Sequence, residues 1–349
     1  MKFKTMSVHS GQRIDPQTGA LTTPLYQSST FSYFNAQAGK ERFAGQAPGF
    51  IYSRFGNPTT AELEQKLAAL EGADEALVVA SGMAAVSAIM YALADSGDEV
   101  AYIGPLYGGT DAFLKQTFSR AGIKITAYES DRDLPANIRP ATKVVLFETL
   151  TNPTLKVVDP RLVVEAARKV GAITGCDNTF LTPYLLRPLE LGVDVVMHSG
   201  TKYLGGHGDI IAGVVAGSHA LMKSIRTVAL KHIGSPIGPQ EAYLLQRGVK
   251  TLPLRMDAHL HNAQKVAEFL AAHPAVKKVI YPGLANHPGH DALGAFASGF
   301  GGMVSIELEG GFERCATLLD NLQLFVQAVS LGDLESLACH PASTTHAAM

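Results

Sequence analysis

Short runs of apolar residues, separated by helix-like stretches, constrain the fold of this chain more than any other feature of its sequence. Near-continuous apolar strands of this kind are typical of parallel sheets that are covered by helices on both faces. The pattern therefore predicts an α/β fold with a mostly parallel sheet. The expected strands are residues 75–79, 99–103, 143–147, 172–176, 193–197 and 211–216, with helices between them such as 84–94 and 161–170.

A helix is also expected directly before the first of these strands. Thr59 and Glu62 have the spacing of a capping box, an apolar stripe follows them, and Gly72 is suited to end the helix. Ligands of parallel α/β sheets bind beyond the carboxyl ends of the strands. A site is therefore expected among the residues that follow the strands.

Three parts of the chain differ in composition and periodicity. Residues 1–50 are rich in Ser, Thr, Gln and Gly and weakly periodic, which predicts an N-terminal arm that contacts a neighbouring subunit. Residues 51–235 contain the strands above and form the large domain. Residues 236–349 are expected to form a smaller α+β domain, with a helical region at 240–273, strands at 276–281, 303–308 and 324–329, and a helix near 312–322.

Composition and simple motifs disfavour several classes of protein. A chain of 349 residues with 46% hydrophobic residues and a net charge of −2 fits a globular enzyme, and favours neither nucleic acid nor a membrane as a partner. No apolar run reaches the length of a membrane span, and residues 1–5 lack the apolar core of a signal peptide, so we expect a cytoplasmic protein. The cysteines and histidines have no metal-ligand spacing, so no metal is expected. The motifs of nicotinamide and P-loop nucleotide sites are missing from the sequence.

Lys202 is the strongest candidate for a reacting group. It lies in the run HSGTKY at 198–203, which follows an expected strand. A lysine on such a turn can form a Schiff base with an aldehyde cofactor, while Ser199 and Thr201 hold a phosphate. Asp177 follows the preceding expected strand and could pair with a protonated pyridine nitrogen. These are the protein groups that pyridoxal phosphate (PLP) chemistry requires.

Two further turns carry candidate cofactor contacts. Ser81, Gly82 and Met83 follow a strand and begin a helix, where free backbone N–H groups and the helix dipole form an anion site. Tyr107 stands on a glycine-containing turn, from which its ring could stack on a pyridine face.

Asn152, Tyr52 and Arg54 are further candidates for cofactor contacts. Asn152 follows an expected strand and could donate a hydrogen bond to the phenolic oxygen of PLP. Tyr52 and Arg54 offer a phenol and a guanidinium, which suit a phosphate. Because both lie before the first expected helix, they could act across a subunit boundary.

Taken in order, these motifs resemble the Cys/Met metabolism family of PLP-dependent enzymes, the γ-family of fold-type I. The resemblance covers essentially the whole chain and is carried by residues 52–58, 81–83, 107–110, 177–180, 198–207 and 330–332. It implies an aspartate-aminotransferase-like subunit with a seven-stranded, mostly parallel sheet and a smaller C-terminal domain. It also implies a homotetramer, built as a dimer of dimers, with each PLP at a dimer interface.

The resemblance also implies a role for each candidate residue. Lys202 carries the PLP covalently and is catalytic together with Tyr107, which stacks on the ring. Val329, Ser330 and Gly109 contact the substrate. The implied cofactor contacts are Tyr52 and Arg54 of the neighbouring subunit and, in the same chain, Gly82, Met83, Tyr107, Asn152, Asp177, Thr179, Ser199, Thr201 and Lys202.

Several reactions of this family remain open. Residues 203–209 and 328–333 are most similar to methionine γ-lyases, which convert methionine to methanethiol, 2-oxobutanoate and ammonia. Cystathionine-handling members often have a glutamate at the position of Val329, so an apolar residue there favours a short uncharged thioether. Gly109 and His232 depart from the methionine-lyase pattern, which typically has cysteine and an acidic residue at these positions. The alternatives are cystathionine γ-lyase, O-acetylhomoserine or O-succinylhomoserine sulfhydrylase, and cystathionine γ-synthase.

The C-terminal domain looks incomplete by the same resemblance. Members of the family continue for several dozen residues past the position of Met349, and that part includes an arginine that binds the substrate α-carboxylate. No arginine follows Arg314 in this sequence. A truncated PLP-binding subunit without activity is therefore the alternative to an enzyme.

Overall fold

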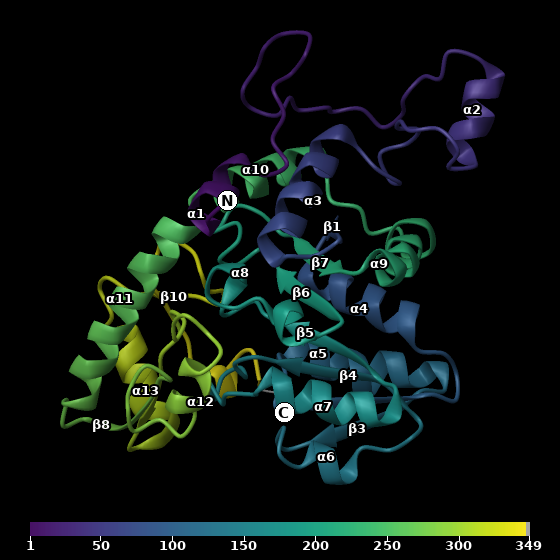
Figure 1. Cartoon of the computed structure of the whole chain (residues 1–349). Helices are drawn as coiled ribbons and strands as arrows, with labels where there is room; N and C mark the ends of the chain where they lie inside the picture. Colours follow the sequence, from purple (N-terminus) through teal and green to yellow (C-terminus); the bar gives the residue numbers. More distant parts are fainter. Residues whose placement is uncertain (347–349) are drawn as a thin grey trace.

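The computed structural model describes residues 1–346 and is organised around a seven-stranded sheet (Figure 1). The strand order is β1-β7-β6-β5-β4-β2-β3, in which β7 runs antiparallel to both of its neighbours and the other pairs are parallel. The predicted α/β fold with a mostly parallel sheet is therefore confirmed. The strands are β1 (Glu75–Val79), β2 (Glu99–Ile103), β3 (Lys124–Tyr128), β4 (Thr142–Glu148), β5 (Ile173–Asp177), β6 (Val195–Ser199) and β7 (Gly213–Gly217).

Each strand predicted within the large domain forms within two residues of its expected bounds. β3 was not predicted, because it lies at an edge of the sheet and several of its residues are exposed, so it lacks a continuous apolar run. Asp177 and Ser199 are the last residues of β5 and β6 rather than the first residues after them. Both side chains therefore belong to the rigid end of the sheet.

Alternate residues of each strand pack on opposite faces of the sheet. In β1, Leu77 and Val79 join the apolar cluster that includes α4, whereas Ala76 and Val78 join the cluster that includes α3. Both faces are covered, which explains the apolar strands. One face carries α4 (Gly82–Leu93) and α9 (His219–Arg226), and the other carries α3 (Pro58–Glu71), α7 (Pro160–Val170) and α10 (Pro239–Lys250).

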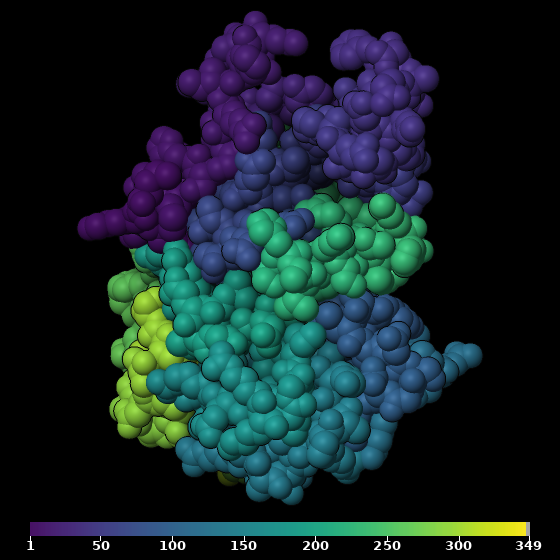
Figure 2. All heavy atoms as spheres, turned by 45° about the vertical axis from the view of Figure 1, so that its right-hand side comes forward, coloured from purple at the N-terminus to yellow at the C-terminus, as the bar shows by residue number. Residues whose placement is uncertain are grey.

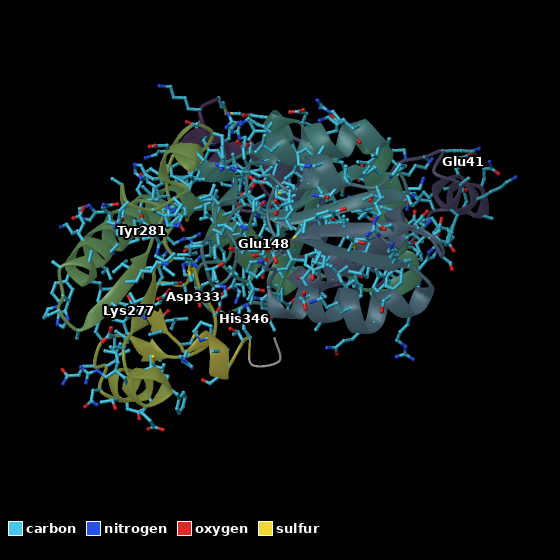
Figure 3. The ribbon with its side chains drawn as sticks, turned by 90° about the horizontal axis from the view of Figure 1, so that it is seen from below. Glu41, Glu148, Lys277, Tyr281, Asp333 and His346 are labelled. Atoms are coloured by element: carbon cyan, nitrogen blue, oxygen red, sulfur yellow. The ribbon has the colours of Figure 1, made fainter. Side chains whose placement is uncertain are left out.

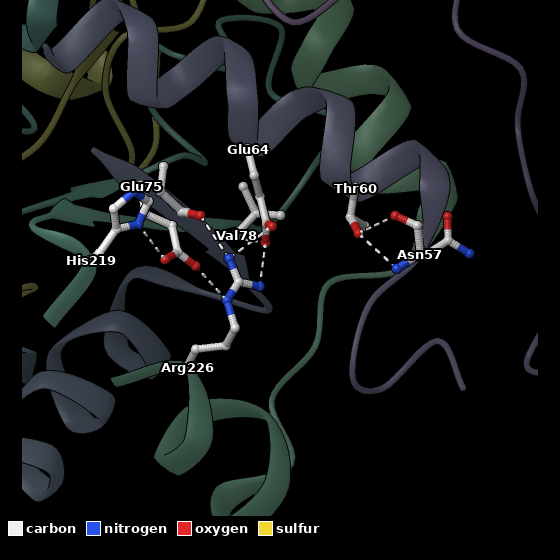
Figure 4. Close-up of polar contacts among 8 residues, drawn as sticks. Asn57, Thr60, Glu64, Glu75, Val78, His219 and Arg226 are labelled. Atoms are coloured by element: carbon white, nitrogen blue, oxygen red, sulfur yellow. Dashed lines mark hydrogen bonds and ion pairs between the residues drawn. The ribbon is translucent and has the colours of Figure 1, made fainter. Parts of the chain in front are cut away.

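The N-terminal cap of α3 differs from the prediction. Asn57 caps the helix by accepting from the Thr59 amide at 2.9 Å, and its own amide donates to the Thr60 hydroxyl at 3.3 Å (Figure 4). The predicted capping box of Thr59 and Glu62 is wrong, because a proline occupies the first helical position and moves the cap to the residue before it. Gly72 ends the helix as predicted, with a φ of 70°.

The first residues of the chain pack on their own subunit. α1 (Phe3–His9) lies over α3, where the buried Lys66 amine donates to the carbonyl oxygens of Ser7 and Val8 at 3.0 and 2.9 Å. The segment between α1 and α3, which includes α2 (Ala36–Phe43), extends away from the body (Figures 1 and 2). Its contact with a neighbouring subunit stays a prediction.

The C-terminal region contains α11 (Leu252–Ala271) and two small sheets. The helical region predicted at 240–273 divides into α10 and α11 at Thr251, because Pro253 cannot donate to a continuing helix. The strand predicted at 324–329 is reduced to β10 (Val326–Gln327), which pairs with β11 (Leu337–Ala338). The other strands are β8 (Val276–Ile280) and β9 (Ser305–Leu308), and the helices are α12 (His290–Gly294) and α13 (Gly311–Asp320).

The remaining elements are short helical turns within residues 1–346. Across this range, no helix is long and apolar enough to cross a membrane. The short α-helices are α5 (Gly108–Ala112), α6 (Leu134–Asn137) and α8 (Thr182–Leu185), the π-helical segments are Phe113–Thr117 and Thr227–Ile233, and the 3₁₀ turns are Phe118–Ala121, Pro188–Leu191 and Pro341–Ser343.

Candidate active site

A cavity of about 350 Å³ lies at the carboxyl ends of β4, β5 and β6, where the sheet meets the C-terminal region. This is the edge at which parallel α/β sheets bind ligands. Most of the candidate residues from the sequence line it. They are Gly82, Met83, Tyr107, Asn152, Asp177, Thr179, Ser199, Thr201, Lys202, Val329 and Ser330.

Lys202 lies on the turn that follows β6. Its amine donates to the Ser330 hydroxyl at 2.9 Å, across 128 residues of sequence. Burial lowers the pKa of this amine, and the Asp333 carboxylate opposes that shift. The Lys202 amine therefore loses its proton at a lower pH than the amine of an exposed lysine. This favours the neutral amine, which a nucleophile or a base requires.

Asp177 ends β5, and its half-buried side chain lines the cavity. One carboxylate oxygen accepts from both the amide, at 3.0 Å, and the hydroxyl of Thr179. That hydroxyl in turn accepts from the Ser199 amide at 2.8 Å, which joins the ends of β5 and β6. Burial raises the pKa of Asp177, and the hydrogen bonds from Thr179 oppose the shift. A cation beside this carboxylate would be strongly favoured.

An anion-binding turn lies at the start of α4. Ser81 caps the helix by accepting from the Ala84 amide at 3.1 Å, and the Gly82 and Met83 amides have no acceptor within residues 1–346. A Cβ atom at Gly82 would lie only 3.1 Å from the Cβ atom of Ser199. Glycine thus allows these free N–H groups to approach the Ser199 hydroxyl, and both suit a phosphate.

The Tyr107 ring covers the turn to which it belongs. A Cβ atom added to Gly109 would lie 2.6 Å from Cε1 of that ring, so glycine is needed for this ring position. Gly109 is not among the cavity-lining residues; it lies behind Tyr107. A direct contact between Gly109 and a substrate stays a prediction.

Tyr52 and Arg54 do not line the cavity of their own chain. The Arg54 guanidinium donates to the Leu230 and Lys231 carbonyl oxygens at 2.9 and 3.3 Å, and stacks over the Phe55 ring. Tyr52 is 41% exposed beside the same ring. A role in a neighbouring subunit's site stays a prediction for both residues.

Glu148 ends an apolar strand, but no function could be assigned to it from the sequence. Glu148, which is labelled in Figure 3, lines the cavity. Its carboxylate accepts from the backbone amides of Tyr107 and Asn152. A charged residue at the end of a buried strand was the available signal. The buried pair of His198 and Glu71 was also missed, because only the folded chain brings residues 127 positions apart into contact.

The donor set in this cavity fits PLP. A nucleophilic amine, a buried carboxylate and a phosphate-binding helix terminus correspond to the aldehyde, the ring nitrogen and the phosphate of that cofactor. Lys202, Asp177, and the α4 terminus with Ser199 supply these groups. The residues present could therefore hold the cofactor that the sequence predicts.

Comparisons with known proteins agree with this chemistry. The family model described as Cys/Met metabolism PLP-dependent enzyme matches residues 4–349. The chain is 47% identical to L-methionine gamma-lyase from Pseudomonas putida, over 99% of this chain and 87% of that protein. It is 44% identical to cystathionine gamma-lyase from Bacillus subtilis, over 100% and 90% of the two chains.

A solved structure is similar throughout. The putative O-acetylhomoserine (thiol)-lyase from Campylobacter jejuni, which contains N′-pyridoxyl-lysine-5′-monophosphate, matches with a TM-score of 0.95 and 34% identity. The match covers 100% of this chain and 91% of that one. This chain thus has nearly the same fold as a protein that is named for a reaction other than those of the two relatives above.

Proposed function

The chain belongs to the family of Cys/Met metabolism PLP-dependent enzymes, and within that family we propose that it is a methionine γ-lyase. The reaction would consume methionine and water and release methanethiol, 2-oxobutanoate and ammonia. The observation that carries this choice is Val329, an exposed apolar residue in the lining of the cavity. Val329 lies there next to Ser330, the partner of the Lys202 amine, and offers no charge to a substrate with a charged distal group.

The cofactor would be held by the residues that line the cavity. PLP supplies an electron sink for the electrons released at the substrate α-carbon. We assign its covalent attachment to Lys202, its ring nitrogen to Asp177, and its phosphate to the α4 terminus with Ser199 and Thr201. The donor chemistry of the cavity supports each assignment.

Two side chains would move protons during the reaction. Lys202 removes the proton at the substrate α-carbon, which requires a neutral amine, and its lowered pKa increases the neutral fraction near pH 7. Ser330 holds this amine at the cavity wall by the bond of 2.9 Å. Tyr107, also at the cavity wall, is the proposed donor of a proton to the leaving sulfur.

Cystathionine γ-lyase activity is the second candidate. Gly109 favours it, because this position typically carries cysteine in methionine γ-lyases and a missing side chain leaves Tyr107 more room. The relative from Bacillus subtilis is nearly as similar as the one from Pseudomonas putida. The two activities differ in the substrate group that the cavity must accept, which is a charged distal group in cystathionine and an uncharged methyl thioether in methionine.

A substrate panel tests the proposal directly. The purified full chain, loaded with PLP, is assayed with methionine, cystathionine, and O-acetylhomoserine plus sulfide. A kcat/KM for methionine above that for cystathionine supports the methionine γ-lyase. A preference for cystathionine, or formation of homocysteine from sulfide, would replace it by the corresponding relative.

Val329→Glu is expected to shift the ratio of kcat/KM values about tenfold toward cystathionine. The new carboxylate would attract the distal ammonium of cystathionine, while a methyl thioether would lose an apolar contact. We limit the expected effect because Val329 is 59% exposed, so water screens the new charge.

Ile211→Glu is the matched control for this substitution. Ile211 lines the same cavity, is apolar and is 66% exposed, but lies on the segment before β7. An equal shift of the kcat/KM ratio in both variants would mean that a negative charge anywhere near the cavity favours cystathionine, whatever its position. No shift in Val329→Glu would remove Val329 from the specificity argument.

We also propose that each site is shared between two subunits. Arg54 and Tyr52 precede α3 on the extended segment and lie outside their own cavity. Mixing an Arg54→Ala chain with a Lys202→Ala chain should restore activity to at most about a quarter of the parent value, because half of the dimers are hybrid and each hybrid has one intact site. No recovery after verified subunit exchange would mean that Arg54 acts within its own chain.

A further inference from the structure

Glu148 connects two loops of the cavity to the end of the sheet. One oxygen of its carboxylate accepts from the Tyr107 amide in the loop after β2, and the other accepts from the Asn152 amide at 3.1 Å in the loop after β4. β4 lies between β2 and β5 in the sheet, so its last residue can reach both loops. These are the loops that carry the proposed ring-stacking and ring-oxygen contacts.

Neither amide has another acceptor in the described chain of 346 residues. Tyr107 lies at the N-terminal end of the short helix α5, where amides have no helical partner, and Asn152 lies in an irregular loop. Without Glu148 both amides would be unpaired at the cavity wall. The carboxylate therefore holds these two loops at a defined position relative to the end of the sheet.

The position of Glu148 is electrostatically unfavourable by itself. The side chain is 6% exposed, and its residue is the register partner of Asp177 on β5. Burial and the Asp177 charge raise the pKa of Glu148, and the two amide bonds oppose this shift. Two buried carboxylates side by side need such donors, and a bound ring cation would favour both of them.

We propose that Glu148 is a positioning residue that fixes Tyr107 and Asn152 against the carboxyl end of the sheet, so that both are in place when PLP binds. The importance of these two residues to PLP rests on the proposed function, but the two hydrogen bonds do not. Glu148 acts through other residues and is not assigned a contact with the substrate.

A glutamine at position 148 separates this role from simple space filling. Glutamine keeps the shape of glutamate, but only its carbonyl oxygen accepts, and its NH₂ group would face one of the two amides. Glu148→Gln should therefore release one loop while the fold stays intact. Glu99 supplies the matched control, since its carboxylate is also buried but lies at the opposite end of the sheet, where it accepts from the Thr142 hydroxyl at 3.0 Å.

Residue-resolved amide exchange of the full chain without PLP is the first measurement. In the parent protein, the Tyr107 and Asn152 amides should exchange at least about tenfold more slowly than the Gly82 and Met83 amides, which have no acceptor in the described residues. In Glu148→Gln, at least one of the two protected amides should exchange about tenfold faster, and in Glu99→Gln neither should change. Fast exchange of Tyr107 and Asn152 in the parent would overturn the proposal, even if the glutamine variant failed to fold.

A tryptophan at position 107 gives a second, independent measurement, because the chain contains no tryptophan. In the Tyr107→Trp background, acrylamide quenching of the fluorescence of this single tryptophan should increase about twofold with Glu148→Gln and stay unchanged with Glu99→Gln. Glu148→Asp, which keeps two acceptor oxygens, should recover part of the difference.

The dissociation constant for PLP completes the test. It should rise about tenfold in Glu148→Gln, and Glu148→Asp should give an intermediate value. Weaker PLP binding with unchanged amide exchange would mean that Glu148 acts through its charge. Faster amide exchange with unchanged PLP binding would mean that PLP binding does not depend on the positions of the two loops. Either result overturns the proposal. None of these measurements uses an amino-acid substrate, so they remain valid if the methionine assay fails.

Discussion

Lys202→Ala is expected to lower kcat by at least about 10³-fold, the loss typical of a missing positioned acid–base group. The amine would both anchor the cofactor and remove the α-proton, so the variant loses two functions with one group. Within residues 1–346, Lys202 is the only lysine that lines the cavity. The parent should show a yellow absorbance band that borohydride bleaches, and the variant should not.

Peptide mapping after borohydride reduction locates the attachment. The label should lie on Lys202 and not on Lys66, a second lysine whose pKa is lowered, to about 8, but which is bound to α1 away from the cavity. Lys202→Arg keeps a positive charge and should be as inactive as the alanine variant. Normal turnover by Lys202→Ala, or a label on Lys66, would contradict the assignment.

Asp177→Asn is expected to lower kcat about 10³-fold, which corresponds to about 4 kcal/mol of lost stabilisation. A neutral amide in this buried position cannot balance a protonated ring nitrogen as a carboxylate does. Asp194→Asn is the matched control. Its carboxylate accepts from the amide and hydroxyl of Thr174 at 2.8 and 2.7 Å, the same donor types that Thr179 offers Asp177, but lies at the opposite end of β6.

Asp177→Asn, which should lower kcat, should not lower the stability of the PLP-free protein. Burial raises the folded-state pKa of Asp177 above its ordinary value, so the ionised carboxylate destabilises the fold at neutral pH. The destabilisation decreases as the pH drops from above the raised folded-state pKa to below the ordinary pKa of an aspartate, because the carboxylate becomes protonated. Asp177→Asn should remove this destabilisation at neutral pH. Thermal unfolding of the PLP-free proteins at pH 7 should give Asp177→Asn a Tm no lower than the parent. Retained turnover in Asp177→Asn would exclude the ring-nitrogen role.

Most elements of residues 51–235 follow from local sequence patterns. The apolar runs predicted the strands to within two residues, because strands buried on both faces need apolar residues at successive positions. The edge strand β3 was not predicted, because it has a neighbouring strand on one side only and is partly exposed, so its sequence is not a continuous apolar run. The C-terminal strand at 324–329 was overestimated for the opposite reason: its apolar residues are largely exposed in the structure.

Most of the candidate cofactor residues could be identified from the sequence because they lie at the end of a strand or on the turn that follows it. Asp177, Ser199 and the turn before α4 meet at one edge of the sheet simply because their strands are parallel neighbours or lie close in the strand order. Sequence alone could not say which substrate would enter, since chains that are similar to this one over almost its whole length are named for different reactions.

The sequence by itself indicated six of the seven strands of the sheet, the lysine that we propose as the reacting group and the candidate groups that suit PLP, because periodicity and turn chemistry are local properties. Only the tertiary structure decided that Ser330 holds the Lys202 amine and that Glu148 binds the Tyr107 loop. These contacts join residues 128 and 41 positions apart. They depend on the order of the strands and on the packing of the C-terminal region, which no local pattern encodes.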